Sequence, residues 1–231
     1  SRRSRAHVLG GVRGMTEVEH LPISVVIPTF GRDQVLTDTI AQLLEQCPAA
    51  AEVIVVDQTP VHDAETTTLL TRWHEIGAIR WARLSTPSQP GALNHAISIA
   101  TQPLLLFLDD DIRIGPHFIA NHCAAFDSPD IWAVIGQVLQ PEEQERMDYQ
   151  HAVQSGPLAD LEFPFRSGRR TFVQNGMSGN MSLRREVALA LGGFDENFLP
   201  PVSYRFDTDF CKRLIRAGGK IRFEPKARID H

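Results

Sequence analysis

The chain has 231 residues, of which 42% are hydrophobic, 22% charged and 7% aromatic, with 23 Lys and Arg against 28 Asp and Glu. This composition is typical of a folded globular protein and excludes a disordered, collagen-like or disulfide-scaffold chain. The formal net charge of −5 argues against non-specific nucleic-acid binding, which depends on an excess of basic residues. The three cysteines (Cys47, Cys123 and Cys211) lack metal-binding spacing and predict reduced thiols in a cytoplasmic protein.

The first twenty residues differ from the rest of the chain. Residues 1–14 contain Arg2, Arg3, Arg5 and Arg13 and lack the apolar core of a signal peptide. We therefore expect residues 1–20 to form a flexible N-terminal leader. No stretch of the sequence approaches the ~18 apolar residues that a membrane helix needs. A transmembrane segment is accordingly not expected, although peripheral association with a membrane stays open.

From residue 21 onward, short apolar runs alternate with segments of helical periodicity. Strands are predicted at residues 23–27, 52–57, 79–84 and 104–108, and helices at residues 32–46, 66–76 and 90–100. The strands are apolar throughout rather than alternating. This pattern predicts an α/β fold with a mostly parallel central sheet and helices on both faces.

The second half is less regular. We predict a strand at residues 132–138, helices at residues 184–191 and 207–217, and a short last strand at residues 221–223. Residues 140–170 show no clear period and predict a long loop. Residues 171–180 are rich in glycine.

Polar residues follow three of the predicted strands, at residues 29–32, 57–59 and 109–111. Ligands of parallel α/β sheets bind beyond the carboxyl ends of the strands, so these clusters predict one ligand-binding rim. Asp109 and Asp111 point the same way in an extended segment, and Asp110 points opposite. Hard oxygen ligands of this kind suit Mg²⁺ or Mn²⁺, although an acidic turn is the simpler alternative. Neither a Walker A loop nor G-x-G-x-x-G follows the first strand.

These segments resemble the inverting glycosyltransferases of family 2, which have the GT-A fold. The resemblance covers nearly all of residues 21–231 and implies a single GT-A domain, with a nucleotide-sugar-binding half (21–115) and an acceptor-binding half (116–231). The matching segments, in order, are ISVVIPTFGR (23–32), EVIVVDQTP (52–60), PGALNHAISIA (90–100), LLFLDDDI (105–112), GMSGNMSLRR (176–185), GGFDENF (192–198), RFDTDFCKRLIRAG (205–218) and ARIDH (227–231).

The resemblance implies a UDP-, dTDP- or GDP-sugar donor, a carbohydrate or other hydroxyl acceptor, and a Mn²⁺ or Mg²⁺ cofactor. The roles it carries over are nucleotide binding for Thr29, Gly31, Arg32, Asp57, Asn94 and Asp110, metal binding for Asp109, Asp111 and His231, and general base for Asp207.

Two departures from the family pattern stand out. The acidic pair before the last helix is Phe206-Asp207 rather than Glu-Asp, so the expected base is kept and its neighbour is lost. After the second strand the family often has Asp-Asp-Gly-Ser, where this chain has Asp57 followed by Gln58, Thr59 and Pro60. The Q-x-x-R-W motif of processive synthases is absent.

The base role also has a physical rationale. Asp207 precedes a predicted helix, where the helix dipole favours the ionised carboxylate that could accept the proton of an attacking hydroxyl. An ordinary N-cap, as could be said of Asp209, is the simpler alternative. Apart from His231, the histidines are interpreted as mostly surface or packing residues.

Two other functions stay open. A sugar-nucleotide nucleotidyltransferase shares the α/β plan and the carboxylate-bound metal, but its glycine-rich basic loop is reduced here to Gly31-Arg32. A non-catalytic nucleotide-sugar-binding domain is the other alternative, because Phe206 replaces the Glu of the family's acidic pair.

Overall fold

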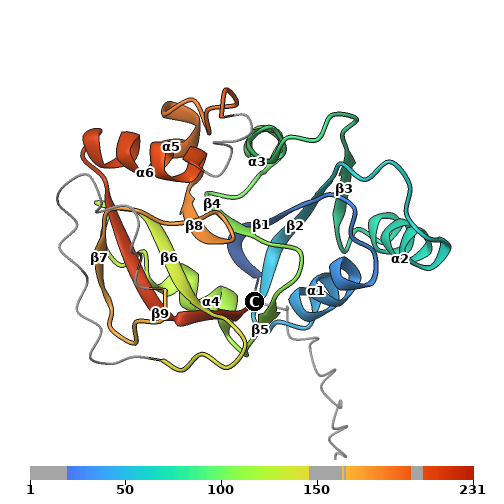
Figure 1. Cartoon of the computed structure of the whole chain (residues 1–231), viewed down its shortest axis with the longest axis horizontal. Helices are drawn as coiled ribbons and strands as arrows, with labels where there is room; N and C mark the ends of the chain where they lie inside the picture. Colours follow the sequence, from blue (N-terminus) through green and yellow to red (C-terminus); the bar gives the residue numbers. More distant parts are fainter. Residues whose placement is uncertain (1–19, 146–162, 164, 199–204) are drawn as a thin grey trace, which may run out of the picture.

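The computed structural model describes residues 20–145, 163, 165–198 and 205–231, so residues 1–19 of the expected leader lie outside it. Within these residues nine strands form one sheet in the order β3-β2-β1-β4-β8-β6-β9-β5, with β7 paired to β9 (Figure 1). The strands are β1 (His20–Thr29), β2 (Ala49–Asp57), β3 (Arg80–Arg83), β4 (Leu104–Leu108), β5 (Arg113–Ile114), β6 (Ile131–Leu139), β7 (Thr171–Val173), β8 (Asn180–Arg184) and β9 (Lys220–Asp230).

Six of these nine strands run in one direction. β1, β2, β3 and β4 are parallel neighbours, and β6 and β9 continue in their direction beyond the antiparallel β8. The short strands β5 and β7 pair antiparallel with β9. The predicted mostly parallel sheet is therefore confirmed, and its antiparallel strands are β5, β7 and β8.

Helices cover both faces of the sheet (Figure 1). Successive strand side chains point to opposite faces, so Val26 joins the apolar cluster under α3, α5 and α6, while Val25 and Ile27 join the cluster under α1, α2 and α4. None of the described helices is long and apolar enough to cross a membrane. The helices are α1 (Gln34–Leu44), α2 (Ala64–Glu75), α3 (Gln89–Ile99), α4 (Phe118–Ala124), α5 (Arg185–Ala190) and α6 (Phe206–Arg216).

Strand pairing brings the polar strand ends together. Thr29 at the end of β1 is in register with Asp57 at the end of β2, and β1 pairs on its other side with β4, which leads into the acidic triplet. Pairing of β6 with β9 places Asp230 opposite Leu139, and His231 follows at the same edge. Segments 200 residues apart in sequence thus meet at one rim.

The second half contains elements that the sequence pattern did not predict. The helix α4 begins after His117, which has a left-handed φ of 60°, so no ordinary start signal precedes it. The expected glycine-rich segment contains β7, and β8 begins at its last residue, where Asn180 and Ser182 are buried despite their polarity. The strand β9 is longer than residues 221–223 because it also pairs with β5 and β6. Residues 146–162 of the predicted long loop lie outside the described chain.

Candidate active site

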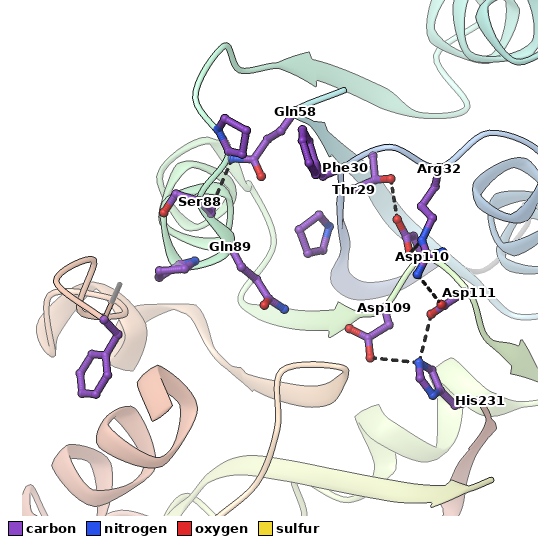
Figure 2. A pocket seen from close by; sticks show the side chains of 14 residues that line it. Thr29, Phe30, Arg32, Gln58, Ser88, Gln89, Asp109, Asp110, Asp111 and His231 are labelled. Atoms are coloured by element: carbon purple, nitrogen blue, oxygen red, sulfur yellow. Dashed lines mark hydrogen bonds and ion pairs between the residues drawn. The ribbon is translucent and has the colours of Figure 1, made fainter. Parts of the chain in front are cut away.

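A cavity of about 580 Å³ opens at the rim where β1, β2 and β4 end (Figure 2). It is bounded by the β1–α1 loop, the start of α3, the acidic triplet and the last residue of the chain. The described lining residues are Pro28, Thr29, Phe30, Arg32, Gln58, Pro87, Ser88, Gln89, Pro90, Asp109, Asp110, Asp111, Phe198 and His231.

The acidic triplet divides into two parts, as the alternation along the chain predicts. The middle carboxylate, Asp110, turns toward β1, where the Thr29 hydroxyl donates to it over 2.5 Å and Arg32 Nε lies 3.6 Å away. Asp109 and Asp111 instead turn toward the chain end (Figure 2). His231 Nε2 lies 3.8 Å from an Asp109 oxygen and 3.1 Å from an Asp111 oxygen.

Two carboxylates and an imidazole are a suitable donor set for Mn²⁺ or Mg²⁺. In this arrangement His231 makes ion-pair contacts with both carboxylates, and no group of three or more His, Cys, Asp or Glu side chains among the described residues is arranged to hold a metal ion. The chemistry of Asp109, Asp111 and His231 therefore fits a divalent cation.

Electrostatics at the triplet favour a bound cation. Burial raises the pKa of Asp109, and repulsion by Asp111 and Asp110 adds to this against the opposing effect of His231. Burial also raises the pKa of Asp110, although the Thr29 hydrogen bond and Arg32 oppose the increase. Adjacent carboxylates that resist ionisation in this way are stabilised when positive charge is supplied between them.

The Asp109 side chain lies so close to Gly179 that a larger residue there would displace the carboxylate. A Cβ atom on Gly179 would lie 2.2 Å from an Asp109 oxygen, and the Asp109 N–H donates to the Gly179 carbonyl over 3.3 Å. The glycine of the segment 176–185 therefore permits the close approach of β8 to the acidic triplet.

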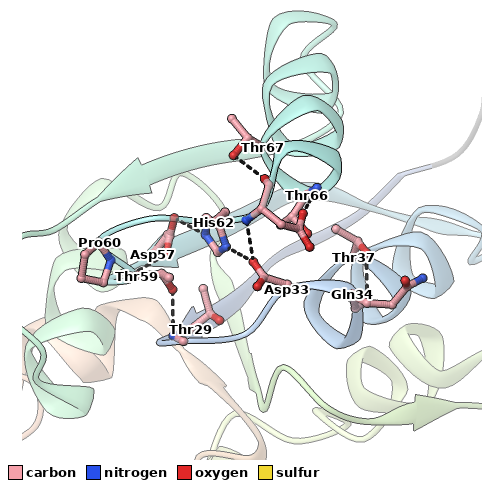
Figure 3. Close-up of polar contacts among 12 residues, drawn as sticks. Thr29, Asp33, Gln34, Thr37, Asp57, Thr59, Pro60, His62, Thr66 and Thr67 are labelled. Atoms are coloured by element: carbon pink, nitrogen blue, oxygen red, sulfur yellow. Dashed lines mark hydrogen bonds and ion pairs between the residues drawn. The ribbon is translucent and has the colours of Figure 1, made fainter.

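The structure does not place the Asp57 side chain in the cavity. Asp57 is fully buried, and its oxygens accept hydrogen bonds from the Thr59 N–H at 2.8 Å and Trp81 Nε1 at 2.9 Å. A third hydrogen bond comes from His62 Nε2 at 2.9 Å (Figure 3). An Asp at the end of a buried strand has the same sequence pattern whether its side chain faces the ligand cavity or is buried against other segments of the protein. The next residue, Gln58, lines the cavity instead.

Gln58 presents a defined hydrogen-bonding group. Its amide nitrogen donates to the carbonyls of Thr86 and Ser88 at 2.9 and 3.0 Å. Since an amide nitrogen carries only two hydrogens, its carbonyl oxygen is the group that can serve a ligand. Such an acceptor suits a ring N–H of a nucleobase.

Asp207 lies in the first turn of α6. It is not among the described residues that line the cavity. It accepts hydrogen bonds from the side chain and backbone of Ser178, its Oδ1 is buried without a partner, and burial raises its pKa to about 7. The helix dipole favours the ionised form by about 1 kcal/mol or less at most helix ends, and desolvation outweighs it at Asp207. Phe206 packs edge-on against Phe194, with ring centroids 5.5 Å apart, so the residue that replaces the family's Glu belongs to the core.

Asn94 and Gly31 also lie outside the described lining. The Asn94 amide donates to the Phe194 carbonyl and to Glu196, and its oxygen accepts from the Phe194 N–H at 2.8 Å. These hydrogen bonds hold the 192–198 loop against α3, and the last residue of this loop lines the cavity. Gly31 has a φ of +69° and donates its N–H to the Thr59 hydroxyl, so it shapes the β1–α1 loop.

Sequence reasoning missed several lining residues. Phe30 is 55% exposed at the cavity, and its position between Thr29 and Gly31 was the available signal. Ser88 and Gln89 at the start of α3 carried no motif. His62, interpreted as a surface or packing residue, instead has a buried ring between two carboxylates.

The mostly parallel sheet with helices on both faces is that of the GT-A fold. The sequence model described as "Glycosyltransferase like family 2" matches residues 20–231, and the chain belongs to this family, as the resemblance in sequence predicted.

Relatives and solved structures agree with this assignment. The O-antigen biosynthesis protein RfbC of Myxococcus xanthus is 27% identical over 230 residues, covering 90% of this chain and 17% of the relative. The pre-mycofactocin glycosyltransferase of Mycobacterium tuberculosis is 25% identical over 214 residues, covering 92% and 43%. The chain thus spans less than half the length of these two relatives.

Two solved structures show the same fold. The mannosyltransferase PcManGT from Pyrobaculum calidifontis, in complex with GDP-Man and Mn²⁺, matches with a TM-score of 0.67 and 18% identity, covering 92% of this chain and 57% of that one. GalNAc-T7 with UDP, GalNAc and Mn²⁺ matches with a TM-score of 0.68 and 15% identity, covering 90% and 43%.

Proposed function

We propose that this chain transfers a sugar, with inversion, from a UDP-, dTDP- or GDP-sugar to a hydroxyl of a carbohydrate or other acceptor. The observation that carries the proposal is the meeting of Asp109, Asp111 and His231 beside Arg32 at one end of a rim cavity. In this proposal the three side chains hold Mn²⁺ or Mg²⁺. When bound, the ion supplies Lewis-acid stabilisation of the diphosphate leaving group.

Arg32 is well placed to help with the same charge. Its guanidinium lies 3.0 Å from Asp111 and is about half exposed, so it can reach a phosphate oxygen from the carboxylate it now contacts. Guanidinium groups bind phosphate through paired, charge-assisted hydrogen bonds. Arg32 would therefore orient the diphosphate against the metal-binding carboxylates and stabilise the negative charge that develops on departure.

At the opposite end of the cavity we assign the nucleoside. Phe30 offers an exposed aromatic face, and the Gln58 carbonyl can accept a hydrogen bond from a base N–H. Uracil, thymine and guanine each have a ring N–H, which is consistent with the three donor classes. The Asp57 carboxylate would stabilise this end of the cavity indirectly, because it accepts a hydrogen bond from the Thr59 N–H, next to Gln58.

Asp207 is proposed as the general base. A pKa of about 7 leaves a large share of the carboxylate ionised at neutral pH and able to hold the proton that the acceptor hydroxyl loses during attack. Ser178 would orient the carboxylate through its two hydrogen bonds. An intact, perturbed carboxylate favours an enzyme over a non-catalytic binding domain.

The proposal is tested by a thermal-shift panel of UDP, dTDP, GDP, ADP and CDP, each with and without Mn²⁺, followed by turnover of the sugar form of the nucleotide that binds. We expect metal-dependent stabilisation by one of the first three nucleotides. Release of nucleoside diphosphate would support transfer, whereas pyrophosphate-dependent formation of a nucleoside triphosphate would support a nucleotidyltransferase. Binding without turnover by the full-length protein would support a non-catalytic domain. A cytoplasmic location, expected from the unpaired cysteines, is tested by cell fractionation, which also reports peripheral membrane association.

A further inference from the structure

His62 lies in the β2–α2 loop with its ring buried between two carboxylates. Its Nδ1 is 2.8 Å from Asp33 Oδ1, and its Nε2 is 2.9 Å from Asp57 Oδ2 (Figure 3). Only 2% of the side chain is exposed. Ionised carboxylates can only accept hydrogen bonds, so both ring nitrogens must donate, and only the imidazolium form of histidine carries two N–H groups.

The surroundings support a positive ring. Burial alone lowers the pKa of His62, but hydrogen bonds and charges from Asp33 and Asp57 outweigh it and raise the pKa above the usual 6.5. Asp57, which is fully buried, needs a nearby cation because an uncompensated charge in the interior is costly. The charged groups around the ring are Asp33 at the start of α1, Asp57 at the end of β2, the adjacent Asp63 and, 4.0 Å from Asp57, Arg83 of β3.

The Asp33 contact joins His62 to the β1–α1 loop. Asp33 is the N-cap residue of α1, yet its side chain makes no capping hydrogen bond to that helix. Its Oδ1 instead accepts from His62 and, at 3.3 Å, from the Asp63 N–H. Directly before it stand the cavity-lining Phe30 and Arg32, the latter paired with the acidic triplet.

We propose that His62 is a positioning residue for donor binding, joining Asp57 to Asp33 as an imidazolium and thereby fixing the β1–α1 loop that holds Phe30 and Arg32 at the cavity. The inference rests on the proposed function, since the loop is taken as the nucleotide-diphosphate wall. A neutral ring can donate to only one of the two carboxylates, so the other contact becomes repulsive. Loss of the proton therefore loosens the loop, and donor affinity falls as the pH rises through the pKa of His62.

Two measurements test this role. The first is the ring ¹⁵N chemical shifts of the labelled wild-type protein at pH 7, with the His62 signals assigned by their absence in His62→Gln. We expect imidazolium shifts for this ring. Neutral-tautomer shifts for this ring would overturn the proposal.

The second measurement is the calorimetric affinity for UDP and GDP with Mn²⁺ between pH 6 and 9. Wild-type binding should weaken about tenfold across this range, the equivalent of one charge-assisted hydrogen bond, and Asp33→Asn should move the decline to lower pH. His62→Gln should bind about tenfold more weakly at pH 6 and lack this decline, while His74→Gln, at an exposed histidine of α2, should follow the wild type. His62→Gln affinity and pH dependence equal to those of the wild type would overturn the role of His62 alone. Absence of nucleoside diphosphate binding by the wild type would overturn the proposed function, and the role of His62 with it.

Discussion

The Thr29 hydroxyl donates a 2.5 Å hydrogen bond to Asp110, which ties the end of β1 to the middle carboxylate of the acidic triplet. This contact turns Asp110 away from the side on which Asp109, Asp111 and His231 meet. Three adjacent carboxylates are therefore not equivalent. One belongs to the β1–α1 wall, and the other two face His231, on the side where we propose that a cation binds.

Substitution of the three carboxylates should separate these roles. We expect Asp109→Asn and Asp111→Asn each to weaken Mn²⁺-dependent binding of nucleoside diphosphate by about 100-fold, since even outer-shell partners of metal ligands cost ~10–100-fold when removed. Asp110→Asn should cost no more than about tenfold, because the amide can still accept from Thr29. Calorimetric titrations with and without EDTA measure the difference. Loss of metal-dependent binding only in Asp110→Asn would contradict the assignment.

Asp57→Asn should chiefly affect folding. The substitution removes the charge that the buried His62 and Trp81 groups contact, and removal of one partner from a buried pair costs about 3–5 kcal/mol. Urea unfolding at pH 7 should show a loss of this order. Gln58→Ala is the matched variant, which should bind nucleoside diphosphate about tenfold more weakly and lose much less stability. Unchanged stability in Asp57→Asn would show that the charge of this carboxylate is not needed for its buried contacts with His62 and Trp81.

The sequence could predict the parallel half of the fold because its buried strands are continuous apolar runs that end in polar residues. The opposed orientations of Asp110 and its neighbours followed from the two-residue period of extended chain. The position of Asp57 could not be predicted, since its buried partners Trp81 and His62 belong to segments that meet it only after folding. The strand β8 was hidden because its inward Asn180 and Ser182 are polar, and their burial depends on hydrogen bonds to His122 and, for Asn180, to backbone carbonyls that meet it only after folding.

His122 should make stability depend on pH. Asn180 Nδ2 already donates to two backbone carbonyls, so its oxygen faces His122 Nε2 and requires the neutral ring to carry its hydrogen there. Burial lowers the pKa of His122 to about 4, below the value of about 6.5 in the unfolded chain. Between these values the unfolded chain binds a proton that the folded chain does not, so stability falls as the pH falls.

Titration of His122 should lower the free energy of unfolding at pH 5 by about 2 kcal/mol relative to pH 7, and by about 3 kcal/mol near pH 4. Urea unfolding of the wild type and His122→Gln at pH 7 and pH 5 isolates it, because the carboxylates that also titrate are common to both proteins. The variant should be less stable at pH 7 and lose about 2 kcal/mol less on acidification. Equal losses in the two proteins would contradict a neutral, buried His122.

We expect the Asp207→Asn substitution to lower the transfer rate and to raise the stability of the folded protein. If Asp207 is the general base, the Asp207→Asn variant should transfer sugar about 10²–10⁴-fold more slowly, while donor binding is retained. Because burial raises the folded-state pKa from 3.8 to about 7, the ionised carboxylate destabilises the folded protein at higher pH. The same variant should therefore gain about 4 kcal/mol of stability at pH 8, as an uncharged amide replaces a desolvated charge.

The pH profile supplies the independent check. The rate at saturating donor and limiting acceptor should rise about tenfold per pH unit up to about pH 7 and then level, since only the ionised base accepts the proton. Asp209→Asn, which loses a 2.7 Å ion pair with Arg213 on the same helix, is the matched control and should keep both the rate and the profile. A folded, donor-binding Asp207→Asn protein with the wild-type rate would remove Asp207 from the mechanism and leave its raised pKa as a consequence of packing beside Phe206.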